Sequence, residues 1–95
     1  MLKALIVEDD KFLASSLKAA IADKFDVDVS YNGLDGQKLI DNNIYDFVIA
    51  DSILPGKGGL DLLDYIREDK ELKIPVIVLT IAESTEEKAR VMKHR

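Results

Sequence analysis

Phe47-Val48-Ile49-Ala50-Asp51-Ser52 decides the fold of this chain, because four apolar residues run directly into a carboxylate. A continuous apolar run of this length is typical of a parallel strand that is covered on both faces. In open α/β sheets, ligands bind outside the carboxyl ends of such strands. The stretch therefore predicts a buried strand over residues 46–50 and places Asp51 at the functional edge of the sheet.

A second apolar run, Ala4-Leu5-Ile6-Val7, ends on the acidic residues Glu8-Asp9-Asp10. If the two runs form neighbouring parallel strands, three or four carboxylates converge at one edge of the sheet. Such a cluster is costly unless a cation neutralises it or some of its members stay protonated. The two runs together indicate a metal site and a candidate site for phosphoryl transfer.

The rest of the chain alternates between strand and helix patterns, and its length allows one domain, residues 1–95. Four strands are expected, the second of them a half-exposed edge strand, at residues 2–8, 26–31, 46–50 and 76–80. Helices are expected at residues 10–24, 34–42 and 60–69, and from Ser84-Thr85-Glu86-Glu87 toward Arg95. Strands separated by helices imply right-handed crossovers, and hence a parallel sheet.

The composition excludes several classes of function. The net charge of −5 argues against a nucleic-acid or membrane surface, since both favour Lys/Arg patches. The chain has no cysteine, so neither a disulfide framework nor a Cys-zinc site is predicted, and this fits a cytoplasmic protein. The apolar runs are too short to span a membrane, and no signal peptide is visible at the N-terminus.

The acidic residues suggest a metal-assisted phosphoryl acceptor. Glu8 and Asp9 would hold Mg²⁺, which prefers carboxylate, phosphate and water oxygens, and Asp51 would be the nucleophile. Backbone N–H groups after Asp51 and the hydroxyl of Thr80 would hold the phosphoryl oxygens. The alternative is that Glu8, Asp9 and Asp10 only cap the first helix, whose N-terminus favours acidic residues, while Asp51 solvates a loop.

Four motifs occur in a fixed order along the chain: Leu-Ile-Val-Glu-Asp-Asp at 5–10, Asp-Ser-Ile-Leu-Pro-Gly at 51–56, Gly59, and Pro-Val-Ile-Val-Leu-Thr at 75–80. Together they resemble the receiver domain of two-component response regulators. The resemblance implies a flavodoxin-like three-layer α/β/α fold, with strand order 2-1-3-4 for the strands present. It also implies phosphorelay signal transduction, with a sensor histidine kinase or a histidine phosphotransfer protein as the phosphodonor.

The resemblance assigns roles by position. Glu8 and Asp9 match the acidic metal-binding pair of the family, and Asp51 matches its phosphorylated aspartate. The backbone carbonyl of Ile53 matches the metal ligand two residues later, and Thr80 matches the switch hydroxyl. The resemblance thus implies a Mg²⁺-dependent phosphoacceptor rather than an enzyme, with only slow self-phosphorylation and dephosphorylation.

The resemblance stops before the family's fifth strand and fifth helix. The lysine that the family carries between its fourth and fifth α/β units also has no counterpart among these 95 residues. We therefore expect an incomplete receiver with an apolar fourth-strand edge, a known route to self-association or domain swapping. The alternative function is a degenerate or truncated receiver that acts as a phosphorylation-independent interaction or dimerisation module.

Other classes of protein fit the sequence less well. A flavodoxin-type redox protein needs a phosphate-binding loop after its first strand, where Glu8-Asp9-Asp10 would repel phosphate. A haloacid-dehalogenase-like phosphatase carries a second aspartate where Ile53 stands, and the P-loop pattern of nucleotide-binding proteins is absent.

Overall fold

The computed structural model describes residues 1–52, 54 and 57–79 of the chain. The expected roles of Ile53 and Thr80, and the expected last helix, lie outside these described residues. The elements in chain order are β1 (Leu2–Val7), α1 (Lys11–Ile21), β2 (Phe25–Ser30), α2 (Gly33–Asn42), β3 (Phe47–Asp51), α3 (Gly59–Asp64), the π-helical turn η1 (Tyr65–Asp69) and β4 (Val76–Leu79). Each strand and helix expected within the described residues is present.

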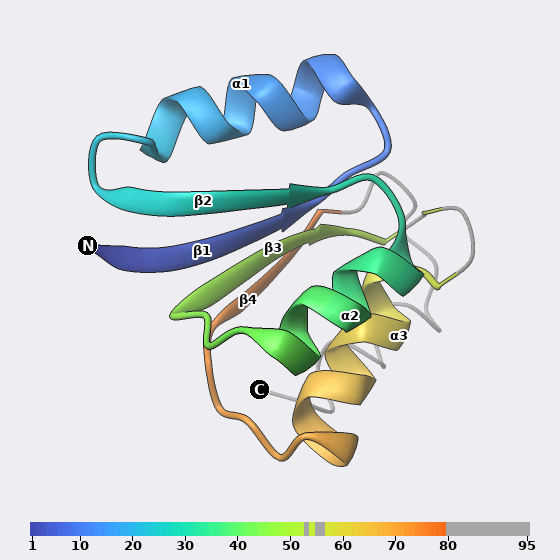
Figure 1. Cartoon of the computed structure of the whole chain (residues 1–95). Helices are drawn as coiled ribbons and strands as arrows, with labels where there is room; N and C mark the ends of the chain where they lie inside the picture. The colour runs from blue at the N-terminus through green and yellow to red at the C-terminus, as the bar shows by residue number, and fades with distance from the viewer. Residues whose placement is uncertain (53, 55–56, 80–95) are drawn as a thin grey trace.

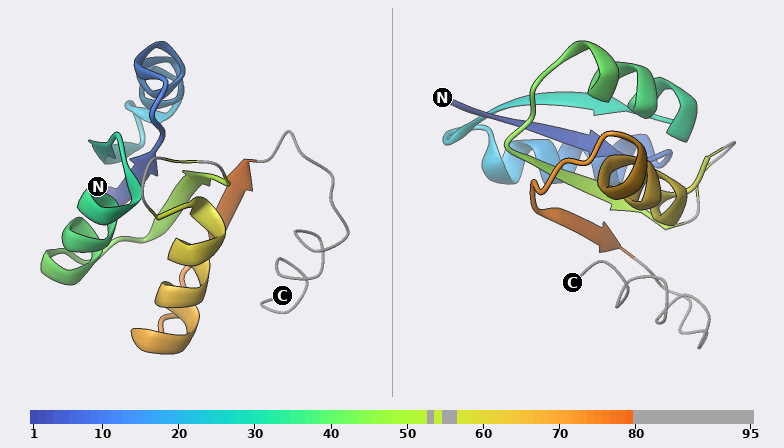
Figure 2. Two further views of the ribbon diagram at one scale, coloured as in Figure 1. Left: turned by 90° about the vertical axis from the view of Figure 1, so that its right-hand side faces the viewer. Right: turned by 90° about the horizontal axis from the view of Figure 1, so that it is seen from below.

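The strands form one parallel sheet in the order β2-β1-β3-β4, which confirms the predicted order. Helix α1 lies on one face of the sheet, and α2 and α3 lie together on the other face (Figures 1 and 2). The described residues therefore form the expected three-layer α/β/α arrangement. None of their helices has the length and apolar character that crossing a membrane requires.

Strand β1 is buried on both faces, which is why its sequence is a continuous apolar run. The exposed fraction of every residue from Ala4 to Val7 is 0%. Leu5 and Val7 pack into the core beneath α2 and α3, whereas Ile6 packs into the core beneath α1. Because consecutive side chains of a strand point to opposite faces, only an unbroken apolar run can serve both cores.

The two outer strands of the described sheet differ in character. Strand β2 carries Asp26 and Asp28 between its apolar residues, and this alternation confirms the expected half-exposed edge strand. In β4, Ile77 is paired with Ile49 of β3 and yet keeps 50% of its surface exposed. The face of β4 that lies on the α1 side of the sheet is thus only partly covered.

The helix expected over residues 60–69 is not uniform. It begins as α3 and continues as the wider turn η1, in which the N–H of Lys70 donates to the carbonyl of Tyr65 at 2.9 Å. The segment ends at Glu71, whose φ of 54° lies in the left-handed region. The Arg67 guanidinium donates to the Leu72 carbonyl at 2.8 Å and holds this reversal in place.

Candidate functional site

Three carboxylates converge at the carboxyl edge of the sheet. Glu8 and Asp9 directly follow β1, and Asp51 is the last residue of the adjacent strand β3. One carboxylate oxygen from each of the three lies within 4.8 Å of the others. The structure therefore brings together the three described residues that the sequence predicted for a metal site.

The side chain of Glu8 is buried, with 2% of its residue surface exposed. Its Oε1 accepts a hydrogen bond from the backbone N–H of Asp10 at 3.1 Å. Its Oε2 is also buried, and no hydrogen-bond donor of the described residues reaches it. A buried carboxylate oxygen without a donor is costly, and a cation at this point would satisfy it.

Burial raises the pKa of Glu8 from 4.5 to about 7. The hydrogen bond from the backbone of Asp10 works in the opposite direction, and the neighbouring carboxylates of Asp51 and Asp9 add to the increase. Each effect has the expected sign, since low dielectric and like charges both disfavour the ionised form. In the absence of a cation, Glu8 therefore keeps its proton to a higher pH than an exposed glutamate does.

Asp10 has a different role from its two acidic neighbours. It is the N-cap of α1, and its Oδ1 accepts from the backbone N–H of Leu13 at 3.1 Å. This is the usual arrangement by which an aspartate satisfies a free donor in the first helical turn. Helix capping thus accounts for Asp10, while Glu8 and Asp9 lie beside Asp51.

Sequence reasoning missed a residue that positions Glu8. The backbone N–H of Glu8 donates to the carbonyl of Ser30 at 2.9 Å, which extends the pairing of β1 with β2 beyond Val7. Ser30 is 3% exposed, and its hydroxyl donates to the carbonyl of Asn32 at 2.8 Å. A serine at the end of an expected edge strand carries no signal of this role until the register of the two strands is known.

The half-buried Asp51 is held from two sides through its backbone. The N–H of the next residue, Ser52, donates to the Leu79 carbonyl of β4 at 2.8 Å. On the other side, the first residue of α3, Gly59, packs against the backbone of Asp51 so closely that a Cβ there would overlap the Asp51 carbonyl oxygen. Sheet and helix together fix where the strand ends.

The sequence matches the family model of the response regulator receiver domain over residues 4–95. The chain belongs to the response regulator receiver domain family. Receiver domains of response regulators take their phosphoryl group from histidine kinases and bind Mg²⁺ through acidic residues. The predictions of a flavodoxin-like fold and of a response regulator receiver domain are thereby confirmed, and both are consistent with phosphorelay signalling.

Two curated relatives illustrate the similarity of this receiver to longer proteins. It is 39% identical over 88 residues to the transcriptional regulatory protein DltR of Streptococcus agalactiae, covering 92% of this chain and 39% of that protein. It is 35% identical over 88 residues to the transcriptional regulatory protein CiaR of Streptococcus pneumoniae, covering 93% of this chain and 39% of that protein. The receiver thus spans about two fifths of the length of these relatives.

Solved structures agree with this assignment. The receiver domain of the Francisella response regulator 1452 is 32% identical, with a TM-score of 0.87, and the match covers 99% of this chain and 78% of that one. The N-terminal domain of a Wolinella succinogenes protein is 30% identical, with a TM-score of 0.91, and the match covers 99% of this chain and 76% of that one.

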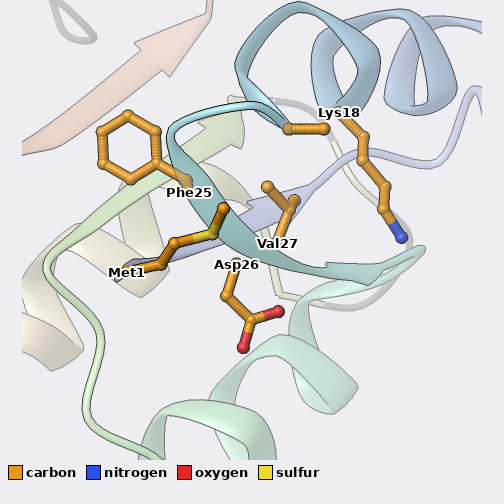
Figure 3. Close-up of a pocket in the computed structure, with 6 residues that line it drawn as sticks. Met1, Lys18, Phe25, Asp26 and Val27 are labelled. Carbon is orange, nitrogen blue, oxygen red and sulfur yellow. The ribbon is translucent and has the colours of Figure 1, made fainter.

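The acidic cluster of the receiver fits a hard divalent cation. All its ligand atoms are carboxylate oxygens, the type that Mg²⁺ prefers, and the buried Oε2 of Glu8 has no hydrogen-bond partner among the described residues. An open hollow of about 460 Å³ lies elsewhere, near the start of β2 and the end of α1 (Figure 3). It is lined by Met1, Lys18, Ala22, Phe25, Asp26 and Val27, none of which belongs to the cluster.

Proposed function

We propose that this receiver accepts a phosphoryl group on Asp51 from the phosphohistidine of a sensor histidine kinase or a histidine phosphotransfer protein. The observation that carries the proposal is the convergence of Glu8, Asp9 and Asp51 within 4.8 Å at the ends of two adjacent parallel strands. Membership of the receiver family supports it, because histidine kinases are the phosphodonors of that family.

In the proposed reaction, a carboxylate oxygen of Asp51 attacks the phosphorus atom of the phosphohistidine. The P–N bond breaks, and its electron pair returns to the imidazole nitrogen, which becomes neutral or takes up a proton. The product on this chain is an aspartyl phosphate. Asp51 suits this role because its half-buried position admits a phosphodonor while its backbone is fixed by β4 and α3.

Glu8, Asp9 and Asp51 are the residues that would hold Mg²⁺, and the backbone carbonyl of Ile53 is a further proposed ligand. The bound cation would offset the repulsion between these carboxylates and the incoming phosphoryl oxygens. Glu8 contributes a charge that stays buried beneath the site, whereas the exposed Asp9 completes the cluster from the solvent side. Thr80 is proposed as the hydroxyl that contacts the phosphoryl group and switches the domain between two states.

The remaining functional assignments follow from the same proposal. The chain acts as a phosphoacceptor in the cytoplasm and not as an enzyme with a separate substrate. Self-association through the outer edge of β4 is a further proposal, supported by the position of β4 at the end of the described sheet and by Ile77, which stays half exposed on the adjoining face of that strand. Size-exclusion chromatography of wild type and Ile77→Lys tests it, and identical monomeric elution of both would contradict it.

The proposed acceptor is tested by incubating the protein with Mg²⁺ and acetyl phosphate and then measuring intact mass. Wild type is expected to gain one phosphoryl group, and both Asp51→Asn and a sample with excess chelator are expected to gain none. Asp10→Asn is the matched control, because asparagine caps a helix as well as aspartate and Asp10 lies outside the cluster. An unmodified wild type, or an equal adduct on Asp51→Asn, would overturn the proposal.

A further inference from the structure

The loop that follows Asp51 touches the first residue of α2. A Cβ built at Gly33 would overlap the carbonyl oxygen of Lys57 and would lie 2.6 Å from the Cβ of Lys57. Only a residue without a side chain permits so close an approach of two backbone segments. The backbone of Lys57 is therefore pressed directly against the start of α2.

The same loop also packs back onto the proposed acceptor. A Cβ at Gly58 would lie 2.6 Å from the carbonyl oxygen of Ser52, and one at Gly59 would overlap the carbonyl oxygen of Asp51. The segment 57–59 thus contacts the end of β3 on one side and α2 on the other, and α3 begins within it. The end of β3, the start of α3 and the start of α2 form one continuous set of backbone contacts.

Side chains also join α2 to η1, the turn that continues α3. The ammonium of Lys57 lies 5.6 Å from the centroid of the Tyr65 ring. The hydroxyl of Tyr65 donates to Oδ1 of Asp41 near the end of α2, and the ammonium of Lys70 lies 3.5 Å from the same oxygen. Together with the contact at Gly33, these interactions connect the start of α2 to the segment before α3, and the end of α2 to η1 and Lys70 after α3.

We propose that α2, α3 and the segment 57–59 respond as one body, and that phosphorylation of Asp51 is transmitted to α2 through the contact between Lys57 and Gly33. This inference rests on the proposed function of Asp51. The segment 57–59 touches the backbone of Asp51 and Ser52, so a shift of that backbone on phosphorylation would reach the segment, because close-packed contacts pass on a displacement instead of absorbing it. Because α1 lies on the opposite face of the sheet, it serves as an internal reference (Figure 1).

Amide hydrogen exchange, measured by mass spectrometry with and without the phosphoryl group, tests the inference. Intact mass of the same samples reports how much adduct has formed, so a failure of phosphorylation is distinguished from a failure of transmission. When the adduct is present, the exchange of amides 34–37 is expected to change by about threefold or more, and that of amides 15–21 in α1 by less. A fully phosphorylated protein with unchanged exchange in α2 would overturn the inference.

Two variants locate the path. Gly33→Ala is expected to form the adduct and to lose the response of α2, because the added Cβ forces the loop away from the helix. Tyr65→Phe leaves the contact at Gly33 intact, so amides 34–37 keep their response while amides 38–42 lose theirs. If Gly33→Ala does not fold, the amide exchange of α2 in wild type and in Tyr65→Phe, with and without the phosphoryl group, tests the inference.

Tyr45→Phe is the matched control for the second variant. It also removes a hydrogen bond between a tyrosine and an aspartate, that of the Tyr45 hydroxyl to Oδ2 of Asp28 at 2.7 Å. Tyr45 precedes β3 and so lies at the opposite end of that strand from Asp51. The response of amides 38–42 is expected to survive in Tyr45→Phe, and equal losses in the two variants would contradict the proposed path.

Discussion

The carboxylate of Glu8 is buried within 4.8 Å of the carboxylate of Asp51, at the ends of two strands that are neighbours in the sheet. Two like charges at this separation, one of them shielded from water, cannot both be ionised without cost. A proton or a cation must therefore offset the cost. The stability of the protein is therefore expected to depend both on pH, through the proton on Glu8, and on the concentration of the cation.

Replacing Glu8 with glutamine is expected to stabilise the metal-free protein at pH 8. Glutamine keeps an acceptor for the backbone N–H of Asp10 but removes the buried charge beside Asp51. We expect the free energy of unfolding in urea to rise by about 1–3 kcal/mol. A decrease in metal-free buffer would show that the charge of Glu8 is already well compensated. The same variant is expected to bind Mg²⁺ more weakly than wild type.

The stability of the metal-free protein is expected to fall as pH rises toward 7. The pKa of Glu8 is about 7 in the folded state, whereas its ordinary value, taken for the unfolded chain, is 4.5. Between pH 4.5 and pH 7 the folded state therefore binds more protons at Glu8 than the unfolded chain does. The proton therefore stabilises the fold fully below pH 4.5, and this contribution is lost as pH rises through 7. The whole effect is about 3 kcal/mol at most.

Urea unfolding of wild type and Glu8→Gln across this pH range isolates the contribution of Glu8. The difference in unfolding free energy between the two proteins should grow in favour of the glutamine variant from pH 4.5 to 7 and then level off. A difference that does not vary with pH would contradict a raised pKa at Glu8. The comparison also removes the contributions of all other titrating groups, which the two proteins share.

The approach of Glu8 and Asp9 to Asp51 could be predicted from the sequence because carboxyl ends of adjacent parallel strands meet at one edge. That β1 and β3 are adjacent came from the family resemblance and not from the apolar runs themselves. The contact of Gly33 with Lys57 and the support of Glu8 by Ser30 could not be predicted. Both depend on strand register and on loop paths, which residue types do not encode locally.

The turn η1 was missed for a related reason. Leu60, Leu63 and Ile66 follow an ordinary helical spacing, and nothing in residues 65–69 distinguishes a π-helical turn from an α-helical one. The wider turn takes part in contacts distant in sequence, among them the hydrogen bond between Tyr65 and Asp41. Helical spacing therefore predicts that a helix forms here, but it does not predict the geometry of the final turn.

Mg²⁺ is expected to stabilise wild type against unfolding, because the folded state alone assembles the three carboxylates. The gain is about 2.7 kcal/mol when the free cation is at 100 times its Kd. Thermal unfolding with increasing Mg²⁺ should show this increase for wild type and for Asp10→Asn, whose side chain caps α1. Asp9→Asn and Asp51→Asn should show much smaller increases, and equal increases in all four proteins would place the cation elsewhere.

The close packing of α3 on the end of β3 makes Gly59→Ala a severe substitution. The added Cβ would overlap the carbonyl oxygen of Asp51 and lie 3.1 Å from the backbone nitrogen of Ser52, so the backbone itself must move. We expect a loss of about 2 kcal/mol or more in unfolding free energy.

Gly36→Ala is the matched control, because its Cβ would meet the side chain of Val7 at 3.0 Å and no backbone atom within that distance. Alanine also favours the helical conformation over glycine by about 1 kcal/mol, which offsets the crowding at Gly36. Urea unfolding should therefore place Gly36→Ala within about 1 kcal/mol of wild type and well above Gly59→Ala, and the reverse order would contradict the packing of α3 against Asp51.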